Sequence, residues 1–197
     1  MLPRPEFYRL IRKGAIRARK MGVSAFTPSE IVLESGDKIA TDLVVLATGW
    51  RTDYALLSKP VRARLQLEAD GLYLYRHILH PEQPRLAFIG NASTISSVLT
   101  YSLQARWLGD LLAGKLVLPS QKAMHGEIDD LREWKRRWMP PSPHRGARLI
   151  LHMLHYHDEL VRDLGATPLR KLGFFAPLME LIAPYQPRDY RSIVAGE

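Results

Sequence analysis

The sequence predicts an α/β protein in which a strand-rich N-terminal part is followed by helices. Residues 43–47 and 86–89 are short apolar runs next to a glycine, a pattern typical of strands buried on both faces of a parallel sheet. Beyond residue 97, apolar residues recur at intervals of three and four, as in helices that bury one face. Strands buried on both faces need neighbours on both sides, so two of them cannot form a stable sheet alone. We therefore expect the rest of the sheet to come from outside this chain.

The composition is that of a globular protein with a hydrophobic core, because 46% of the 197 residues are hydrophobic and 24% are charged. No apolar run approaches the roughly 20 residues that span a bilayer, and no signal peptide is evident, so we expect a cytoplasmic protein. The absence of cysteine excludes disulfides, thiolate metal sites and Cys-x-x-Cys redox chemistry. The net charge of +8 is dispersed, apart from residues 134–138. This dispersal argues against nucleic acid as a partner and leaves phosphorylated small molecules open.

The first ninety residues contain four segments whose structure the sequence predicts. A basic segment at 7–20 predicts a short helix. Apolar runs at 23–26, 30–34 and 38–40, around a Gly-Asp turn, predict a β-hairpin. The apolar run at 43–47 comes next, and the stretch before residue 86 is expected to be rich in loops, with one further candidate strand at 72–75.

Three helices are expected after Gly90. The first ends at Gly114 and has an apolar face made of Val98, Leu99, Leu103, Leu108, Leu111 and Leu112. The second opens at Ser120, ends before a run of prolines, and carries the stripe Met124, Ile128, Leu131, Trp134 and Trp138. A third helix at 148–164 stops at a glycine and leads into a proline-punctuated tail.

Two strand ends carry the residues that suit a ligand site. Thr48 and Gly49 follow the first apolar run, and ligands of open α/β sheets lie beyond the carboxyl ends of strands. Gly90 and Asn91 follow the second run and open a helix, whose free N–H groups suit an anionic or carbonyl-bearing ligand. The alternatives are an ordinary tight turn in the first case and plain N-capping by Ser93 or Thr94 in the second.

The histidines at 152, 155 and 157 do not form a convincing metal site, because only the first two share a helix face and no third ligand is evident. We expect them on a partly exposed helix face. The tryptophans at 134 and 138 fall on an apolar stripe, which favours packing over base stacking.

The chain resembles the flavin-containing monooxygenases, including the plant-type members, over nearly its whole length. Several segments in order carry this resemblance: FYRL at 7–10, LVVLATGW at 43–50, YRHILHP at 75–81, PRLAFIG at 84–90, QARWL at 104–108, YHDEL at 156–160 and YQPRDY at 185–190. No one of these segments is specific, but their order and spacing together are.

The resemblance implies a two-dinucleotide flavoprotein that uses FAD, NADPH and O2. In the family, hydride passes from NADPH to FAD, and one oxygen atom then passes to a soft nitrogen or sulfur nucleophile. The Ala-Thr-Gly turn links the two cofactor domains, which implies that Thr48 and Gly49 lie beside the cofactors. The loop after the later strand lines the flavin, which implies that Gly90, Asn91, Thr94 and Ser97 bind the cofactor. No side chain of the chain is assigned a catalytic role, because the cofactor carries the chemistry.

Three departures from the family pattern stand out. Neither of the Gly-x-Gly-x-x-Gly turns that grip FAD and NADP occurs in the chain. The family fingerprint Phe-x-Gly-x-x-x-His begins at Phe88 and Gly90, but Thr94 stands where histidine is required. Trp50 replaces the tyrosine that usually follows Ala-Thr-Gly.

The expected organisation is a partial two-dinucleotide-binding fold. Residues 1–50 would end the NADP domain, residues 51–120 would form the C-terminal part of the FAD domain, and residues 121–197 would form C-terminal helices and a tail. The expected function is the C-terminal portion of a flavin-dependent monooxygenase that is inactive alone. The alternatives are an inactive remnant, a subunit that works with a separately encoded N-terminal half, and another two-dinucleotide flavoprotein oxidoreductase.

Overall fold

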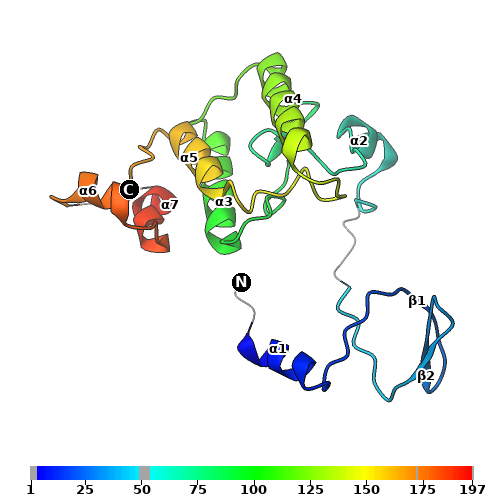
Figure 1. Ribbon diagram of the computed structural model, residues 1–197. Helices are drawn as coiled ribbons and strands as arrows, with labels where there is room; N and C mark the ends of the chain where they lie inside the picture. The colour runs from blue at the N-terminus through cyan, green and yellow to red at the C-terminus, as the bar shows by residue number, and fades with distance from the viewer. Residues whose placement is uncertain (1–3, 49–53, 172, 197) are drawn as a thin grey trace. The chain divides into compact units, whose positions relative to one another are not determined.

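The computed structural model describes residues 4–48, 54–171 and 173–196. The chain divides into two compact units, Met1–Thr52 and Asp53–Glu197. Both helices and strands are present, so the predicted mixture of the two is confirmed, although the named strands pair antiparallel (Figure 1). The two units are described separately below.

The first unit contains a three-stranded antiparallel sheet. Its strands are β1 (Val23–Phe26), β2 (Glu30–Leu33) and β3 (Lys38–Ala40), in the order β1-β2-β3. Gly36 occupies the turn between β2 and β3 with φ of +86°, a left-handed conformation that glycine adopts without steric cost. The hairpin predicted from the Gly-Asp turn is therefore confirmed.

The helix of the first unit, α1 (Pro5–Arg12), is shorter than the predicted segment 7–20. Gly14 follows it with φ of +73°, and its N–H donates to the carbonyl of Ile11. A glycine in this conformation commonly closes a helix, so the chain leaves the helix well before residue 20.

The predicted buried strand at 43–47 is wrong for this chain. Residues 43–48 form no strand and are exposed; Leu43 and Val45, for example, are 78% and 79% exposed. The sheet of the first unit is built from β1, β2 and β3, and it offers this run no pairing. An apolar run becomes a buried strand only where neighbouring strands exist to cover it.

The second unit opens with α2 (Lys59–Arg64) and a hairpin of β4 (Leu79–His80) and β5 (Gln83–Ala87). The predicted strand at 86–89 is thus corrected, because β5 begins earlier, pairs antiparallel and is only partly buried. The two residues between β4 and β5 leave room for a tight hairpin but none for the crossover that a parallel pairing requires. The candidate strand at 72–75 is fully buried irregular backbone.

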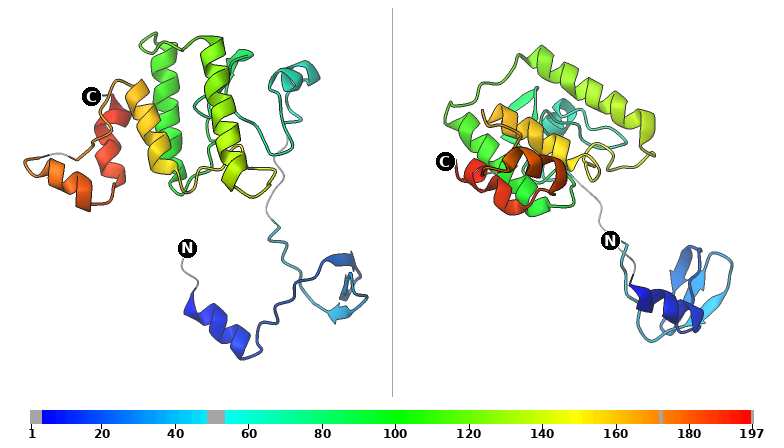
Figure 2. Two further views of the ribbon diagram at one scale, coloured as in Figure 1. Left: turned by 45° about the horizontal axis from the view of Figure 1, so that its top comes forward. Right: turned by 60° about the vertical axis from the view of Figure 1, so that its left-hand side comes forward.

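Helices dominate the rest of the second unit (Figure 2). The three long ones are α3 (Ser97–Leu112), α4 (Gln121–Trp138) and α5 (Met153–Asp163). Three shorter helices follow: α6 (Ala176–Ile182), the 3-10 helix η1 (Pro187–Tyr190) and α7 (Arg191–Ala195). Both α5 and α7 contact α3. Within the described ranges, no helix combines the length and apolar character that crossing a membrane requires.

The ends of the three long helices agree with the sequence signals except at the start of the third. Ser120 caps α4 by accepting a hydrogen bond from the N–H of Ala123 (3.2 Å), and Gly114 follows α3 with φ of +71°. The third helix starts at Met153 rather than 148, because Ser93 and Arg148 form a parallel β-bridge that keeps the chain there extended.

The predicted apolar face of α3 is partly confirmed, because Leu103 is buried and Leu99, Leu108 and Leu111 pack against the core. Val98 and Leu112, in contrast, are 81% and 79% exposed. The fully buried row of the helix is Thr100, Leu103, Gln104 and Trp107. Two of these four residues are polar, so a pattern based on apolar residues alone misses part of the buried face.

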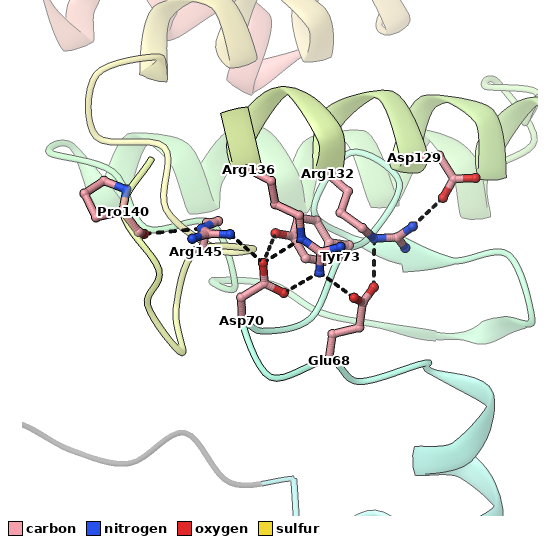
Figure 3. Close-up of polar contacts among 8 residues, drawn as sticks. All are labelled: Glu68, Asp70, Tyr73, Asp129, Arg132, Arg136, Pro140 and Arg145. Atoms are coloured by element: carbon pink, nitrogen blue, oxygen red, sulfur yellow. Dashed lines mark hydrogen bonds and ion pairs between the residues drawn. The ribbon is translucent and has the colours of Figure 1, made fainter. Parts of the chain in front are cut away.

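A cluster of ion pairs fastens the segment before residue 75 to α4 and to the loop after it (Figure 3). The Arg136 guanidinium donates to both carboxylate oxygens of Asp70 (2.9 and 2.8 Å) and to Glu68. Arg145 donates to Asp70 as well (3.1 Å), and Arg132 pairs with Glu68 (2.8 Å). The hydrogen bond from Arg136 holds the pKa of Asp70 down at about 2, so this carboxylate stays charged over the physiological range.

Candidate functional site

The candidate site is the loop between β5 and α3, which contains three of the six predicted cofactor-binding residues, with a fourth, Ser97, at the start of α3. Gly90 has φ of +93°, and its N–H donates to the Oε1 of Gln104 at 2.9 Å. Ser93 is held on the other side, where its N–H donates to Ala147 and its carbonyl accepts from Leu149. Hydrogen bonds to two distant segments therefore fix the course of this loop.

The N-terminus of α3 lies at the end of the loop without a side-chain cap. Ser96 occupies the N-cap position but makes no capping hydrogen bond, in contrast to Ser120 at the start of α4. The predicted alternative, capping by Ser93 or Thr94, is wrong, because both residues precede the N-cap. An uncapped helix of 16 residues leaves N–H groups and the positive end of its dipole available to a ligand.

Asn91 carries the clearest sign of a missing partner. Its Oδ1 accepts a long hydrogen bond from the hydroxyl of Tyr54 (3.5 Å). Its Nδ2 is buried and has no hydrogen-bond partner among the described residues. A buried amide donor without a partner is costly in a folded protein, so each such group calls for an explanation.

Thr94 faces inward and starts a chain of buried polar side chains. Its hydroxyl contacts that of Thr100 at 2.7 Å, and Thr100 contacts the Nε2 of His157 at 2.8 Å. The Nδ1 of His157 lies 3.3 Å from the hydroxyl of Tyr190, which also accepts from Arg170 at 3.1 Å. The loop is thereby tied through α3 and α5 to the C-terminal segment.

His157 was expected on a partly exposed helix face, and this expectation is wrong because its side chain is fully buried. Burial, with a further contribution from the nearby Arg170, lowers the pKa of His157 to about 4. The imidazole is therefore neutral at physiological pH and serves as a hydrogen-bonding link. His155, in contrast, is exposed, with 74% of its side chain accessible.

The remaining predicted residues have less defined surroundings. Ser97 donates to the carbonyl of Thr94 at 3.4 Å and starts α3. Thr48 is exposed in the first unit, and Gly49 lies outside the described residues. Their proximity to the loop stays a prediction.

Sequence reasoning assigned no role to Gln104 and Tyr156, although both support the loop. The Nε2 of Gln104 donates to the Tyr156 hydroxyl (2.7 Å), and that hydroxyl donates to the carbonyl of Arg76 (2.7 Å). Gln104 thus uses both ends of its amide, one on Gly90 and one on Tyr156. The sequence signal that could have identified Gln104 is its position on α3, one helical turn from two buried residues. Its hydrogen-bond partner, Tyr156, is 52 residues away in the sequence.

Comparisons with known proteins agree on one group. The sequence profile described as "FMO-like: Flavin-binding monooxygenase-like" matches residues 5–196. The chain is 30% identical over 188 residues to a "Probable flavin-containing monooxygenase 1" of Arabidopsis thaliana, which covers 94% of this chain and 34% of that relative. It is 31% identical over 153 residues to "Flavin-containing monooxygenase 3" of Canis lupus familiaris, covering 76% of this chain and 27% of that relative.

A solved structure supports the fold. The S-allyl-L-cysteine S-oxygenase from Allium sativum matches with a TM-score of 0.59 at 18% sequence identity, over 87% of this chain and 37% of that one. The chain thus spans about a third of the length of the relatives that it matches.

Proposed function

The chain belongs to the flavin-binding monooxygenase-like family, and from that premise we propose that it supplies the flavin-facing part of an FAD- and NADPH-dependent monooxygenase. The substrates would be O2 and a small molecule with a soft nitrogen or sulfur nucleophile. The remaining part of the cofactor site would come from a separately encoded N-terminal half or from a longer form of the same protein.

The observation that carries this proposal is the unpartnered Nδ2 of Asn91 in the loop before the uncapped α3. A flavin ring presents carbonyl and ring-nitrogen acceptors along one edge, and a buried amide donor fits such an edge. The polar donors of the loop therefore fit FAD, and its fixed backbone fits a rigid planar ring.

Each residue of the loop has a distinct proposed role. Gly90 lets the backbone approach the ring closely, Asn91 donates to an acceptor, and the N-terminus of α3, with Ser97, favours negative charge on the reduced ring. Thr94 holds the loop to α3 through Thr100. When bound, FAD supplies hydride acceptance from NADPH and oxygen transfer to the nucleophile.

The grip on the cofactor phosphates is proposed to lie elsewhere. The 197 residues contain no Gly-x-Gly-x-x-Gly turn, which this type of dinucleotide site needs for close approach of backbone N–H groups to the pyrophosphate. We therefore propose that the chain alone binds FAD weakly and is inactive alone. The domain assignments 1–50, 51–120 and 121–197 and the cytoplasmic location belong to the same proposal.

Co-expression tests the proposal. The purified chain is expected to be colourless, whereas the chain co-expressed with a polypeptide that carries both glycine-rich turns is expected to hold FAD. Flavin absorbance near 450 nm measures the bound cofactor. NADPH consumption with N,N-dimethylaniline or a thioether, with mass spectrometry of the N-oxide or sulfoxide, measures the activity.

Asn91→Leu in the assembled protein is expected to weaken FAD binding about tenfold, the effect of losing one hydrogen bond to a buried donor. Ser102→Ala is the matched control, because the Ser102 hydroxyl bonds only to the carbonyl of Val98 within α3. Unchanged flavin content in Asn91→Leu would refute the assigned site. Stoichiometric flavin in the chain alone would refute the proposed division of the cofactor site.

A further inference from the structure

A pocket of about 550 Å³ lies within the second unit. It is lined by residues of α4, α5 and the segment around residues 74–77, and none of Gly90, Asn91, Thr94 or Ser97 lines it. Its volume falls in the range of small-molecule sites. The pocket is therefore a candidate site for a ligand other than the flavin.

The walls of the pocket combine aromatic and aliphatic surface. Trp134 of α4 and Tyr156 of α5 contribute aromatic rings, and Trp134 packs edge-to-face against His152 with ring centroids 4.5 Å apart. Leu74, Ile128 and Leu149 add aliphatic surface. Such a lining binds an apolar body of several carbon atoms.

The charged groups of the pocket leave an excess of negative charge. The one arginine in the lining, Arg76, is already neutralised, because it pairs with Asp163 (2.7 Å) and with Glu127 (2.6 Å). Asp130 and Glu159 also line the pocket from α4 and α5, and neither pairs with a lysine or arginine of the described residues. Burial raises the pKa of Glu159, whereas the nearby Arg76 and His155 act in the opposite direction.

A buried histidine in the wall has one ring nitrogen that is not used in a hydrogen bond. His77 is 2% exposed and lines the pocket, and its Nδ1 has no hydrogen-bond partner among the described residues. Burial lowers the pKa of His77 well below its usual value, so the ring is neutral. Its edge packs on Tyr156, with ring centroids 5.3 Å apart.

We infer that this pocket binds an organic cation, an ammonium group on an apolar body, with the cationic head near Glu159 and Asp130 and the body against Trp134 and Tyr156. Carboxylates and aromatic faces both attract a cation, and the attraction grows when the cation leaves water. The site is distinct from the flavin loop and needs no bound cofactor.

Benzyltrimethylammonium is the probe that tests the inference. As a quaternary ammonium it has no lone pair to be oxygenated, so its binding is independent of the proposed monooxygenase activity. Titration of the purified chain at pH 8, followed by calorimetry and tryptophan fluorescence, is expected to show saturable binding. Neopentylbenzene has nearly the same shape without the charge and is expected to bind about tenfold more weakly, the typical scale of a partly desolvated cation–aromatic and carboxylate attraction.

Two variants locate the binding site. Glu159→Gln is expected to weaken binding of the cation about tenfold and to leave neopentylbenzene unaffected. Asp130→Asn changes an exposed side chain, so it tests the same charge excess even if the first variant folds poorly. Glu133→Gln is the matched control on α4, because Glu133 is exposed and does not line the pocket.

The inference would be overturned if millimolar benzyltrimethylammonium showed no saturable binding, or if neopentylbenzene bound with equal affinity. It would also be overturned if neither Glu159→Gln nor Asp130→Asn lowered the affinity for the cation. Tighter binding of phenylacetate than of the cation would likewise overturn it, because that result would show that Arg76 dominates the pocket. Loss of flavin binding in the assembled protein would leave the inference standing.

Discussion

The two units of the chain differ in what surrounds their secondary structure. In the first unit, Leu33 is the one buried residue among residues 4–48, although β2 pairs with both β1 and β3. In the second unit, a continuous core runs from Tyr73 to Tyr190. Hydrogen-bonded pairing is present in both units, but extensive apolar burial is present in one.

This difference separates local structure from stability. A Gly-Asp turn and β-branched residues suffice to specify a hairpin, yet burial of apolar surface is the dominant stabilising term in folding. We therefore expect the second unit to carry the measurable unfolding transition. The first unit is expected to depend on surface supplied by other parts of the protein.

The largest effect is expected from Trp107, which is fully buried in α3 and donates from Nε1 to Asp163 at 2.9 Å. Trp107→Ala should lower the unfolding free energy of the second unit by about 3–5 kcal/mol, because it leaves a large cavity. Phe174→Ala is the control, since Phe174 is 92% exposed, and it should change stability by less than about 0.5 kcal/mol. Urea denaturation followed by circular dichroism measures both; equal effects would contradict the assigned core.

Lys135 should give the second unit a distinctive pH dependence. The side chain is fully buried, its Nζ donates to the carbonyl of Gly146 at 2.6 Å, and burial lowers its pKa from 10.5 to about 7. Between these values the unfolded chain binds the proton and the folded chain does not, so stability rises with pH. The gain from pH 7 to pH 10 should be about 2–4 kcal/mol.

Lys135→Met removes the titrating group and is expected to remove most of this rise. Denaturation midpoints at pH 7, 8, 9 and 10 for both proteins provide the measurement. A wild-type stability that falls steadily over this interval, with the same profile in the variant, would contradict the assignment to Lys135.

Thr100 and Ser102 allow a buried and an exposed hydroxyl of α3 to be compared. Thr100→Val keeps the shape but leaves the hydroxyl of Thr94 and the Nε2 of His157 without this partner, at a cost of about 1–3 kcal/mol. Ser102→Ala on the same helix removes only a bond to its own helix and should stay within about 0.5 kcal/mol. Thermal melts rank the two variants, and the reverse order would show that the buried polar chain does not stabilise the fold.

The smallest effect is expected from Leu33, although it is the best-buried residue of the first unit. Leu33→Ala should change the stability of the second unit by less than about 0.5 kcal/mol while hydrogen exchange in β1–β3 speeds up. A lower midpoint for the second unit would show that the two units fold together, which would break the comparison.

The sequence was a good guide where a structure depends on neighbouring residues. The hairpin of the first unit, the Ser120 cap of α4 and the loop that joins β5 to α3 all follow from residues a few positions apart. The apolar stripe of α4 was mostly correct, since Met124 and Ile128 are buried. Trp138 on the same stripe is 43% exposed.

It was a poor guide where partners are distant. The apolar run at 43–47 has the composition of a core strand but no strand to pair with in its unit. The buried face of α3 includes Thr100 and Gln104 because partners 57 and 52 residues away satisfy them. Such partners leave no periodic trace in the sequence, so the buried polar side chains that support the candidate site could not be predicted.

The turn at Arg76 and His77 places backbone strain on two residues that have side chains. Both residues have left-handed backbone, with φ of 49° and 52°, which disfavours each by roughly 1–2 kcal/mol relative to glycine. Glycine or asparagine would form the same bend with less strain. Glycine at either position would also remove side-chain contacts, such as the ion pairs of Arg76 with Asp163 and Glu127, so a glycine scan of this bend would weigh the strain against those contacts.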